Sequence, residues 1–533
     1  MSEPGRDTSD AASAPADRPV LEYHLGYRAA QHPDRPAIIM SGSGEVTTYR
    51  TLDERSNRLA HALREAGLHT GDHLAVMMEN GSALLEVTWA AQRAGLYYTA
   101  VNSHLRHGEV QHILDDCGAE AFFVSARLGD VAKELDLDRI RLRVTVGGEV
   151  PGFEPYDQVL ARGAPTPIDD EAEGREMLYS SGTTGVPKGV RKTLSAGPPG
   201  DPESAAVLIA MFIGARGIGA DAIYLSPAPL YHSAPLVYCM ATHRLGGTCV
   251  VMESFDAAQC LGAIERYRVT HAQFVPTMFT RMLRLPEEER QAHDLSSLQW
   301  VVHAAAPCPI PVKREMLEWW GPIIHEYYAG TEDIGSSQIT PEEWLAHPGS
   351  VGRPLGEVHI VGPGDEEVPV GQTGTVYFAG GREFDYHNDP EKTAKMRNAK
   401  GWRTLGDVGH VDEDGYLYLT DRASDMVVSG GVNIYPREAE LALAAHPRVI
   451  DVAVFGVPDD EMGESLLAVV QADDPAHPPA ADELLAWCRD RLAAYKCPRA
   501  VTFLDAMPRD PSGKLFKRLL RDPYWAGRSS RIV

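Results

Sequence analysis

The sequence predicts an α/β protein, with a large N-terminal domain of layered α/β subdomains plus a β region, and a small α+β C-terminal domain. Over roughly the first 420 residues, apolar strand-like runs alternate with helical patterns, which is typical of layers built on mostly parallel sheet. From Gly371 the pattern changes to short antiparallel strands, GTVYFAG and GYLYLTD, with the turn DEDG at 412–415. After Asp421, strand and helix patterns resume in a smaller unit.

Strand-like apolar runs are expected at 36–40, 73–78, 119–124, 142–146, 222–226, 247–252 and 298–303. Helical patterns cover 51–67 and the region around 82–95. In the last part of the chain, strands are expected at 452–458, 466–472 and 500–505, and a helix at 481–495. At 533 residues the chain is too long for one core, so two or more domains are expected.

The composition indicates a soluble globular protein. Its formal net charge of −25 disfavours nucleic acid or an anionic membrane as a partner, although a local basic pocket for one small anion is compatible with it. No apolar run approaches the length of a membrane span. The seven cysteines are scattered without metal-ligand spacing, which fits a reducing cytoplasm. Residues 1–18 are acidic and rich in small residues, so we expect a disordered tail and no secretory signal.

The most informative segment is YSSGTTGVPKGV at 179–190. Its glycines allow the backbone to approach a ligand closely, its hydroxyl groups can donate hydrogen bonds, and Lys188 adds a positive charge. The segment is not the common phosphate loop, because Pro187 precedes the lysine. A solvent-exposed loop between strands is the plain alternative. The motifs that follow downstream favour a site for a nucleoside triphosphate.

Five further motifs follow in order: HAAAPCP at 303–309, YYAGTED at 327–333, GWRTLGDVG at 401–409, DRASDMVVSGGVNIYP at 421–436 and PRDPSGKLFKR at 508–518. Together they resemble the motifs of AMP-forming acyl- or aryl-CoA synthetases, in the adenylate-forming superfamily that also contains firefly luciferases and peptide-synthetase adenylation domains. The resemblance extends from about Leu21 to Trp525. It implies an acid–thiol ligase with a large adenylation domain at 19–421, a hinge at 422–425 and a small mobile domain at 426–533.

The resemblance also implies which residues bind ATP. Tyr328 would stack on adenine, Asp407 would accept hydrogen bonds from both ribose hydroxyls, and Glu332 would hold Mg²⁺. The other positions assigned to ATP are Ser180, Ser181, Gly182, Thr183, Thr184, Gly185, Lys188, Ala305, Ala306, Pro307, Gly330, Thr331, Arg422 and Lys514. Catalysis is assigned to Lys514, Thr184 and Glu332.

In the implied mechanism, a carboxylate attacks the α-phosphorus of ATP, pyrophosphate leaves, and a CoA thiol then attacks the acyl-adenylate. Lys514 would neutralise charge as the two anions approach. The small domain would turn about Ser424, a position where many relatives carry Asp or Lys. That rotation would bring the CoA-binding loop into place, with Gly430, Gly431 and Asn433 beside the pantetheine tunnel.

Two alternatives share these motifs. An amide-bond synthetase of the same fold would pass the adenylate to an amine, whereas a non-catalytic nucleotide sensor would need neither Lys514 nor Glu332. The absence of a carrier-protein domain and the segment YKCPR at 495–499 favour CoA. The ending SSRIV is not a peroxisomal signal, so we expect a cytoplasmic protein, and a homodimer is compatible with the sequence.

The acyl site is assigned to His232, Tyr327 and Ala304. His232 matches a histidine that gates the acyl pocket, although a core histidine fits equally well. Tyr327 stands where many relatives carry glycine, so its ring should narrow the pocket and favour a medium-sized or aromatic acid over a long fatty acid. Residues 191–206 look like a mobile extension whose Arg191 and Lys192 meet phosphates or solvent. The basic residues Lys517, Arg518 and Arg521 would form a solvated helix face or meet CoA phosphates.

Overall fold

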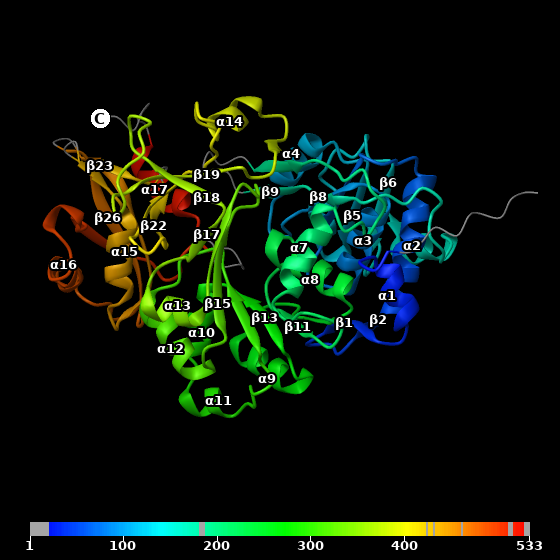
Figure 1. The fold of residues 1–533 in the computed structure, drawn as a ribbon, viewed down its shortest axis with the longest axis horizontal. Helices are drawn as coiled ribbons and strands as arrows, with labels where there is room; N and C mark the ends of the chain where they lie inside the picture. Colours follow the sequence, from blue (N-terminus) through cyan, green and yellow to red (C-terminus); the bar gives the residue numbers. More distant parts are fainter. Residues whose placement is uncertain are drawn as a thin grey trace, which may run out of the picture.

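Two large sheets form most of the N-terminal domain of the computed structural model (Figure 1). The structure describes residues 21–180, 187–422, 425–429, 432–459, 462–509 and 515–526. The expected tail at 1–18 therefore lies outside the described residues. Within those residues, we find no helix with both the length and the apolar character needed to span a bilayer.

The first large sheet has six parallel strands in the order β7-β6-β5-β3-β4-β8. Its strands are β3 (His73–Met77), β4 (Tyr97–Ala100), β5 (Ala121–Ser125), β6 (Leu142–Val146), β7 (Glu154–Pro155) and β8 (Arg175–Glu176). Associated with it are α2 (Tyr49–Glu65), α3 (Ser82–Arg93), α4 (His107–Cys117), α5 (Gly129–Ala132) and α6 (Tyr156–Arg162). The five residues of β5 are all buried, as expected for a parallel strand covered on both faces.

The second large sheet has nine strands in the order β17-β16-β15-β14-β13-β11-β12-β1-β2. They are β1 (Pro36–Met40), β2 (Val46–Thr48), β11 (Ile223–Ser226), β12 (Thr248–Val251), β13 (His271–Phe274), β14 (Trp300–His303), β15 (Ile324–Ala329), β16 (Ser336–Ile339) and β17 (Arg353–Leu355). Its helices are α1 (Leu25–Gln31), α7 (Ala205–Gly214), α8 (Ser233–Leu245), α9 (Ala257–Tyr267), α10 (Pro276–Leu283), α11 (Glu287–Gln291), α12 (Ile310–Trp320) and α13 (Pro341–Ala346). One face packs toward α8 and the other toward α9, α10 and α12.

Two smaller sheets follow the expected change of pattern. One is antiparallel, with β18 (Glu357–Val361), β19 (Gly374–Ala379), β21 (Asp407–Val411) and β22 (Leu417–Arg422). The other contains β9 (Leu178–Ser180), β10 (Lys188–Lys192) and β20 (Phe384–Tyr386), and α14 (Pro390–Lys395) follows β20. Because Val190 pairs with Tyr386, segments almost two hundred residues apart share one sheet.

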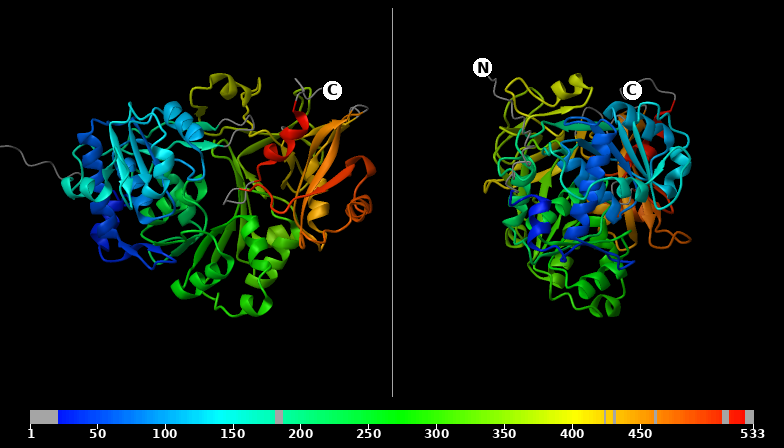
Figure 2. Two further views of the ribbon diagram at one scale, coloured as in Figure 1. Left: turned by 180° about the vertical axis from the view of Figure 1, so that it is seen from behind. Right: turned by 90° about the vertical axis from the view of Figure 1, so that its right-hand side faces the viewer.

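The small domain lies at one end of the molecule, in orange and red in Figure 2. It contains β23 (Val427–Ser429), β24 (Val432–Ile434), β25 (Val449–Asp459), β26 (Gly463–Ala472), β27 (Ala500–Phe503), α15 (Pro436–Ala444), α16 (Ala481–Arg489) and α17 (Lys517–Trp525). The helix expected at 481–495 is shorter than predicted, because α16 ends at Arg489. A separate 3₁₀ turn at Ala494–Lys496 follows, in which the Lys496 ammonium pairs with Glu438 at 2.6 Å.

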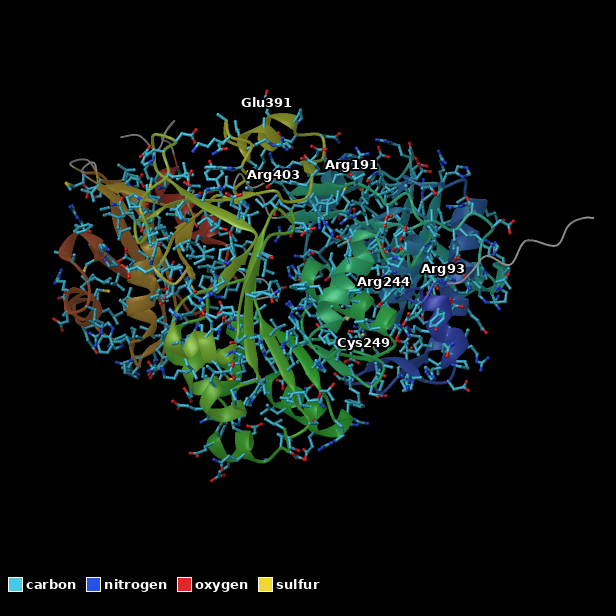
Figure 3. The ribbon with its side chains drawn as sticks, viewed as in Figure 1. Arg93, Arg191, Arg244, Cys249, Glu391 and Arg403 are labelled. Atoms are coloured by element: carbon cyan, nitrogen blue, oxygen red, sulfur yellow. The ribbon has the colours of Figure 1, made fainter. Side chains whose placement is uncertain are left out.

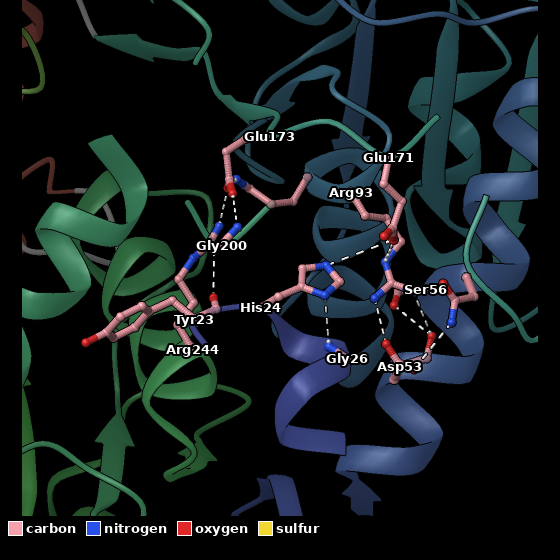
Figure 4. A network of polar contacts seen from close by, with 12 residues as sticks. Tyr23, His24, Gly26, Asp53, Ser56, Arg93, Glu171, Glu173, Gly200 and Arg244 are labelled. Carbon is pink, nitrogen blue, oxygen red and sulfur yellow. Dashed lines mark hydrogen bonds and ion pairs between the residues drawn. The ribbon is translucent and has the colours of Figure 1, made fainter. Parts of the chain in front are cut away.

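A buried ionic network joins the N-terminal segment to the region between the two large sheets (Figure 4). Arg93 of α3 contacts Asp53 at 2.6 Å, and Arg244 of α8 pairs with Glu173. Both arginines lie in the same half of the molecule in Figure 3. Removing one partner of such a pair is costly, because the other charge stays buried. The network therefore fixes how these elements meet.

Parts of the segment 191–206, which was expected to be a mobile extension, contact this buried region. Lys192 is buried and its ammonium lies 3.3 Å from the carboxylate of Glu176, so it meets neither phosphate nor solvent. The backbone N–H of Gly200 donates to Glu173 at 2.8 Å. A side chain at Gly200, whose φ is +85°, would lie 2.9 Å from the backbone nitrogen of His24. The segment thus packs against the N-terminal part of the chain.

Candidate active site

The predicted phosphate-binding segment connects two antiparallel strands. β9 ends at Ser180 and β10 begins at Lys188, and these two residues pair across the strands. The connecting residues assigned to ATP lie outside the described residues: Ser181, Gly182, Thr183, Thr184 and Gly185. A Cβ at Gly189 would lie 3.0 Å from the Tyr179 ring, so this position favours glycine.

Lys188 pairs with a carboxylate that the sequence did not single out. Its ammonium donates to Asp389, and Asp389 in turn accepts from the backbone N–H of Lys392 at 3.0 Å, which caps α14. The Lys392 ammonium lies 4.3 Å from the centroid of the Tyr386 ring. Burial, and then the charge of Lys188, lower the pKa of Lys392. Two ammonium groups near one connecting segment form a suitable environment for a polyphosphate.

Glu332 lies in the turn after β15, and a tyrosine of β20 orients its carboxylate. Tyr386 donates its hydroxyl to Oε1 of Glu332 at 2.7 Å, and the Glu332 side chain is buried. A Cβ at Gly330 would lie 2.6 Å from the Leu405 side chain and 2.7 Å from Oε2 of Glu332, so a larger residue here would displace the Glu332 carboxylate. Thr331 lies between them and is partly exposed.

The donor set fits Mg²⁺ only together with a phosphate. Within the part of the chain that the structure describes, no group of three or more His, Cys, Asp or Glu side chains could hold a metal ion. Mg²⁺ is commonly bound through one or two carboxylates plus substrate phosphates and water. A single oriented carboxylate, that of Glu332, is consistent with this mode of binding.

The residues assigned to adenine and ribose adjoin one another. Tyr328 donates its hydroxyl to Oδ2 of Asp407 at 2.5 Å, and Asp407 is buried. Asp407 also pairs in register with Arg422 across β21 and β22. The side chain of Arg422 is outside the described part of the chain, but its backbone places it next to Asp407. The structure thus brings together three residues that are far apart in the sequence.

The small-residue loop lies at the same sheet edge. It follows β14, which is the parallel neighbour of β15, so both loops leave the sheet at the carboxyl ends of their strands. Ala304 is buried, Ala306 is partly exposed, and Ala305 adopts a φ of +73°, which is uncommon for alanine. Arg437 of α15 donates to the carbonyl oxygen of Pro307 at 3.4 Å. The small domain therefore contacts this loop directly.

Two of the residues assigned to the acid lie in or next to the nine-stranded sheet, Tyr327 in β15 and His232 before α8. The Tyr327 hydroxyl accepts a hydrogen bond from Nε2 of Gln273 at 3.1 Å, and its ring stacks on Tyr238 with centroids 6.5 Å apart. His232 immediately precedes α8, with its ring centroid 4.5 Å from that of Tyr231. This geometry is compatible with either a gate or a core histidine, so the assignment of His232 stays a prediction.

The structure describes only some of the small-domain residues that were assigned to the hinge, to CoA and to catalysis. Gly430, Gly431, Ser424 and Lys514 lie outside the described residues, and Asn433 is described only as a backbone position in β24. Ser429 pairs with Val432, so the strands on both sides of the two glycines form a hairpin. On either side of the Lys514 segment, Arg509 forms a β-bridge with Leu515.

The interpretation of the basic C-terminal residues as a solvated face is wrong for Lys517 and Arg521. The Lys517 ammonium contacts Glu440 at 2.7 Å. Burial alone would lower the pKa of Lys517, but Glu440 and the aspartates nearby outweigh burial and raise it. Arg521 is buried and lies 3.8 Å from Asp425, whereas Arg518 is exposed. These contacts hold α17 in place.

Three residues of the site had not been identified from the sequence: Tyr386, Asp389 and Lys392. They reach the site because β20 returns to pair with β10, and that long-range pairing has no local signature. The one available signal was the dipeptide Asp389-Pro390, which is a typical helix start.

Comparison with known proteins identifies the family. Residues 25–382 match the model of the AMP-binding enzyme family, and residues 438–514 match that of the AMP-binding enzyme C-terminal domain. Feruloyl-CoA synthase of an Amycolatopsis species is 35% identical over 93% of this chain and 97% of its own. Among solved structures, ATP-bound MatB from Rhodopseudomonas palustris superposes with a TM-score of 0.80 at 26% identity, covering 95% of this chain and 99% of its own. Amide bond synthetase McbA from Marinactinospora thermotolerans gives 0.77 at 29% identity, covering 94% and 99%.

These matches extend over nearly the whole chain and over nearly the full length of the similar proteins. They agree with the arrangement of a large N-terminal and a small C-terminal domain, and with ATP as a ligand. The chain therefore belongs to the AMP-binding enzymes, as a member of the acid–thiol ligase family of acyl-CoA synthetases.

Proposed function

We propose that the protein activates a carboxylic acid with ATP and transfers the acyl group to CoA, giving acyl-CoA, AMP and pyrophosphate. The observation that carries the proposal is the convergence of Tyr328, Asp407 and the backbone of Arg422 beside the turn that holds Glu332. These residues suit a nucleotide, and the full-length similarity to feruloyl-CoA synthase supports a thioester product.

In the first half-reaction, an oxygen of the substrate carboxylate bonds to the α-phosphorus while the bond to the β-phosphate breaks and pyrophosphate leaves. A carboxylate is already ionised at neutral pH, so no general base is required. The obstacle is repulsion between two anions. Lys188, Lys392 and, as proposed from the family motif, Lys514 and Thr184 would reduce it, and Mg²⁺ held by Glu332 would neutralise phosphate charge.

In the second half-reaction, the CoA sulfur bonds to the acyl carbon, the bond to AMP breaks, and the thiol proton leaves to solvent. We assign the 430–433 segment to the CoA tunnel and a hinge at 422–425 to the change of conformation. In the described conformation, Arg437 contacts Pro307 and Arg284 donates to the carbonyl of Ile450 at 2.8 Å. Rotation about Ser424 would exchange these few polar contacts for others.

The acid is proposed to be medium-sized or aromatic. The Tyr327 ring, held by Gln273 and Tyr238, occupies space next to the nucleotide residues and would limit a long chain. We expect Tyr327→Gly to extend the accepted chain length, measured as pyrophosphate release across straight-chain acids of increasing length. An unchanged chain-length profile would contradict this role of Tyr327.

An amide-bond synthetase is the second candidate, favoured by the 29% identity to McbA. The two functions are separated by mass spectrometry of products after incubation with ATP, Mg²⁺ and a mixed panel of aliphatic and aromatic acids. Parallel reactions contain CoA, an amine mixture or neither. Thioesters that appear only with CoA support the proposal, whereas amides formed in preference to thioesters favour the second candidate. No AMP with any acid would refute both.

Lys514→Ala tests the catalytic assignment. Loss of one group that stabilises charge in the transition state typically lowers the rate by about 100- to 1,000-fold. We expect adenylate formation to fall by this factor while ATP still binds, as measured by single-turnover AMP formation and by ATP titration. The matched control is Lys395→Ala at the exposed end of α14. Equal adenylation rates in the wild type and Lys514→Ala would remove Lys514 from the mechanism.

A further inference from the structure

One face of the nine-stranded sheet carries polar side chains on β13, β15 and β16. Tyr327 of β15 pairs directly with Gln338 of β16, so both side chains point to the same face. Gln273 of β13 reaches that face too, because it donates to the Tyr327 hydroxyl at 3.1 Å. The neighbouring positions Ile324 and Ile339 belong to the apolar core on the other face. A row of hydrogen-bonding groups therefore lines the side that faces α7 and α8.

Arg216 adds a positive charge to this row. It follows α7, donates one Nη to the side-chain oxygen of Gln338, and donates the other to the carbonyl of Phe212. Its guanidinium also lies 3.6 Å from the centroid of the Phe212 ring. Burial lowers the pKa of Arg216, and Tyr238 nearby raises it in part. The interaction with Tyr238 places Arg216 close to the ring on which Tyr327 stacks.

The hydrogen-bond partners of Arg216 are neutral groups. Across the described residues, no carboxylate lies within ion-pair distance of it, whereas Arg93, Arg175 and Arg244 each contact one. A guanidinium has five N–H donors, and only two are used here. The remaining donors and the uncompensated charge make Arg216 suited to an oxygen acceptor supplied by a ligand.

The position of this group relates it to the acid. Tyr327 lies near the carboxyl end of β15, the edge at which the loops with Ala304 and Glu332 leave the sheet, although its side chain points to the opposite face from that of Tyr328. Tyr238 also stacks on Trp300 and Tyr224 with interplanar angles near 20°, which builds flat walls around the polar row. An acid whose carboxylate lies at the nucleotide site would direct its far end along this row.

We propose that Arg216, oriented by Gln338, binds an oxygen acceptor at the end of the acid remote from the reacting carboxylate. The substrate is then an acid with a second polar group, carried on a ring or a short chain. That oxygen belongs either to a neutral hydroxyl or ether or to a second carboxylate. The inference rests on the proposed function, and it adds a specificity-determining residue to it.

The test uses three acids with one skeleton: cinnamic, 4-hydroxycinnamic and 4-carboxycinnamic acid. We expect the wild type to prefer one of the two substituted acids by kcat/KM for pyrophosphate release. Hydrogen bonds to charged groups are worth about 1.5–3 kcal/mol, which corresponds to a preference of about 10- to 150-fold. A higher kcat/KM for 4-hydroxycinnamic acid would indicate that Arg216 binds a neutral oxygen, and a higher value for 4-carboxycinnamic acid would indicate a carboxylate.

Arg216→Met should remove that preference while leaving kcat/KM for cinnamic acid and the KM for ATP unchanged. Gln338→Leu should reduce the preference by a smaller factor, because the charge remains but is less well oriented. Arg290→Met is the matched control, since Arg290 also lies over an aromatic ring, Trp319 at 5.5 Å, and is remote from the polar row. Thermal stabilisation by each acid gives a second measurement that does not depend on turnover.

Several outcomes would overturn the inference. They are an Arg216→Met enzyme that keeps the preference, equal losses for all three acids, and a wild type that shows no preference in either turnover or binding. Failure of the proposed function looks different, because then no acid releases pyrophosphate. In that case a loss of selective stabilisation in Arg216→Met still supports the binding site, and its retention still refutes it.

Discussion

Two regions of the molecule treat their charged residues differently: the buried ionic network between the two large sheets, and the part of the nine-stranded sheet around Glu332 and Arg216. In the network between the sheets, buried charges pair with opposite charges, as Arg93 does with Asp53 and Arg244 with Glu173. At the edge of the nine-stranded sheet, Glu332 accepts from a tyrosine hydroxyl and Arg216 donates to an amide and a carbonyl. A neutral partner orients a charged group without cancelling its charge. The first region therefore uses charge to hold the fold, and the second retains charge for a ligand.

The largest expected effect is on stability, in the first region. Arg244→Met leaves Glu173 buried without its cation, and breaking such a pair costs about 3–5 kcal/mol. We expect the free energy of unfolding to fall by this amount, measured by urea denaturation. Arg50→Met is the control, because Arg50 pairs with Asp34 on the surface and should change stability by less than about 1 kcal/mol.

The coupling between Arg244 and Glu173 is tested by combining Arg244→Met with Glu173→Gln. The double variant has no unpaired buried charge, so part of the lost stability should return. If the double variant is as unstable as the sum of the single variants, the two residues are not coupled and the account of this region is wrong.

The next largest effect is on the pH dependence of the free energy of unfolding, and it comes from a histidine between the two sheets. His243 is fully buried, its Nδ1 accepts from the Trp89 indole at 3.1 Å, and its Nε2 donates to the carbonyl of Ala37 at 3.1 Å. Burial lowers the pKa of His243 from 6.5 to about 4. The unfolded chain binds this proton more readily, so stability is present above pH 6.5 and is lost as the pH falls toward 4. Between pH 7 and pH 5 we expect a loss of about 2 kcal/mol from this residue.

Urea denaturation at pH 7, 6 and 5 measures this loss. His243→Gln should be less stable at pH 7 but should lose about 2 kcal/mol less than the wild type on acidification. His477→Gln is the control, because His477 lies on the surface. A pH slope that is the same in wild type and His243→Gln would contradict a neutral buried His243.

Local patterns in the sequence were sufficient to predict the strands, and long-range pairing was not predictable. The runs at 36–40 and 142–146 coincide with β1 and β6, because apolar β-branched residues between turn residues are a local signal. The return of β20 to β10 has no such signal, which is why Tyr386 and Asp389 were missed. Lys192 shows the same limit, since only the fold reveals that a lysine in a strand meets Glu176.

The weakest effect is expected on ATP binding, at Asp407. Asp407→Asn keeps an oxygen that can accept from Tyr328 but removes the negative charge. We expect the KM for ATP to rise by about tenfold, or about 1.4 kcal/mol, since hydrogen bonds to a charged acceptor are stronger than those to a neutral one. Stability should change by less than it does in Arg244→Met. If Asp407→Asn instead destabilises the protein as much as Arg244→Met does and leaves the KM for ATP unchanged, the charge of Asp407 stabilises the fold, and the difference between the two regions disappears.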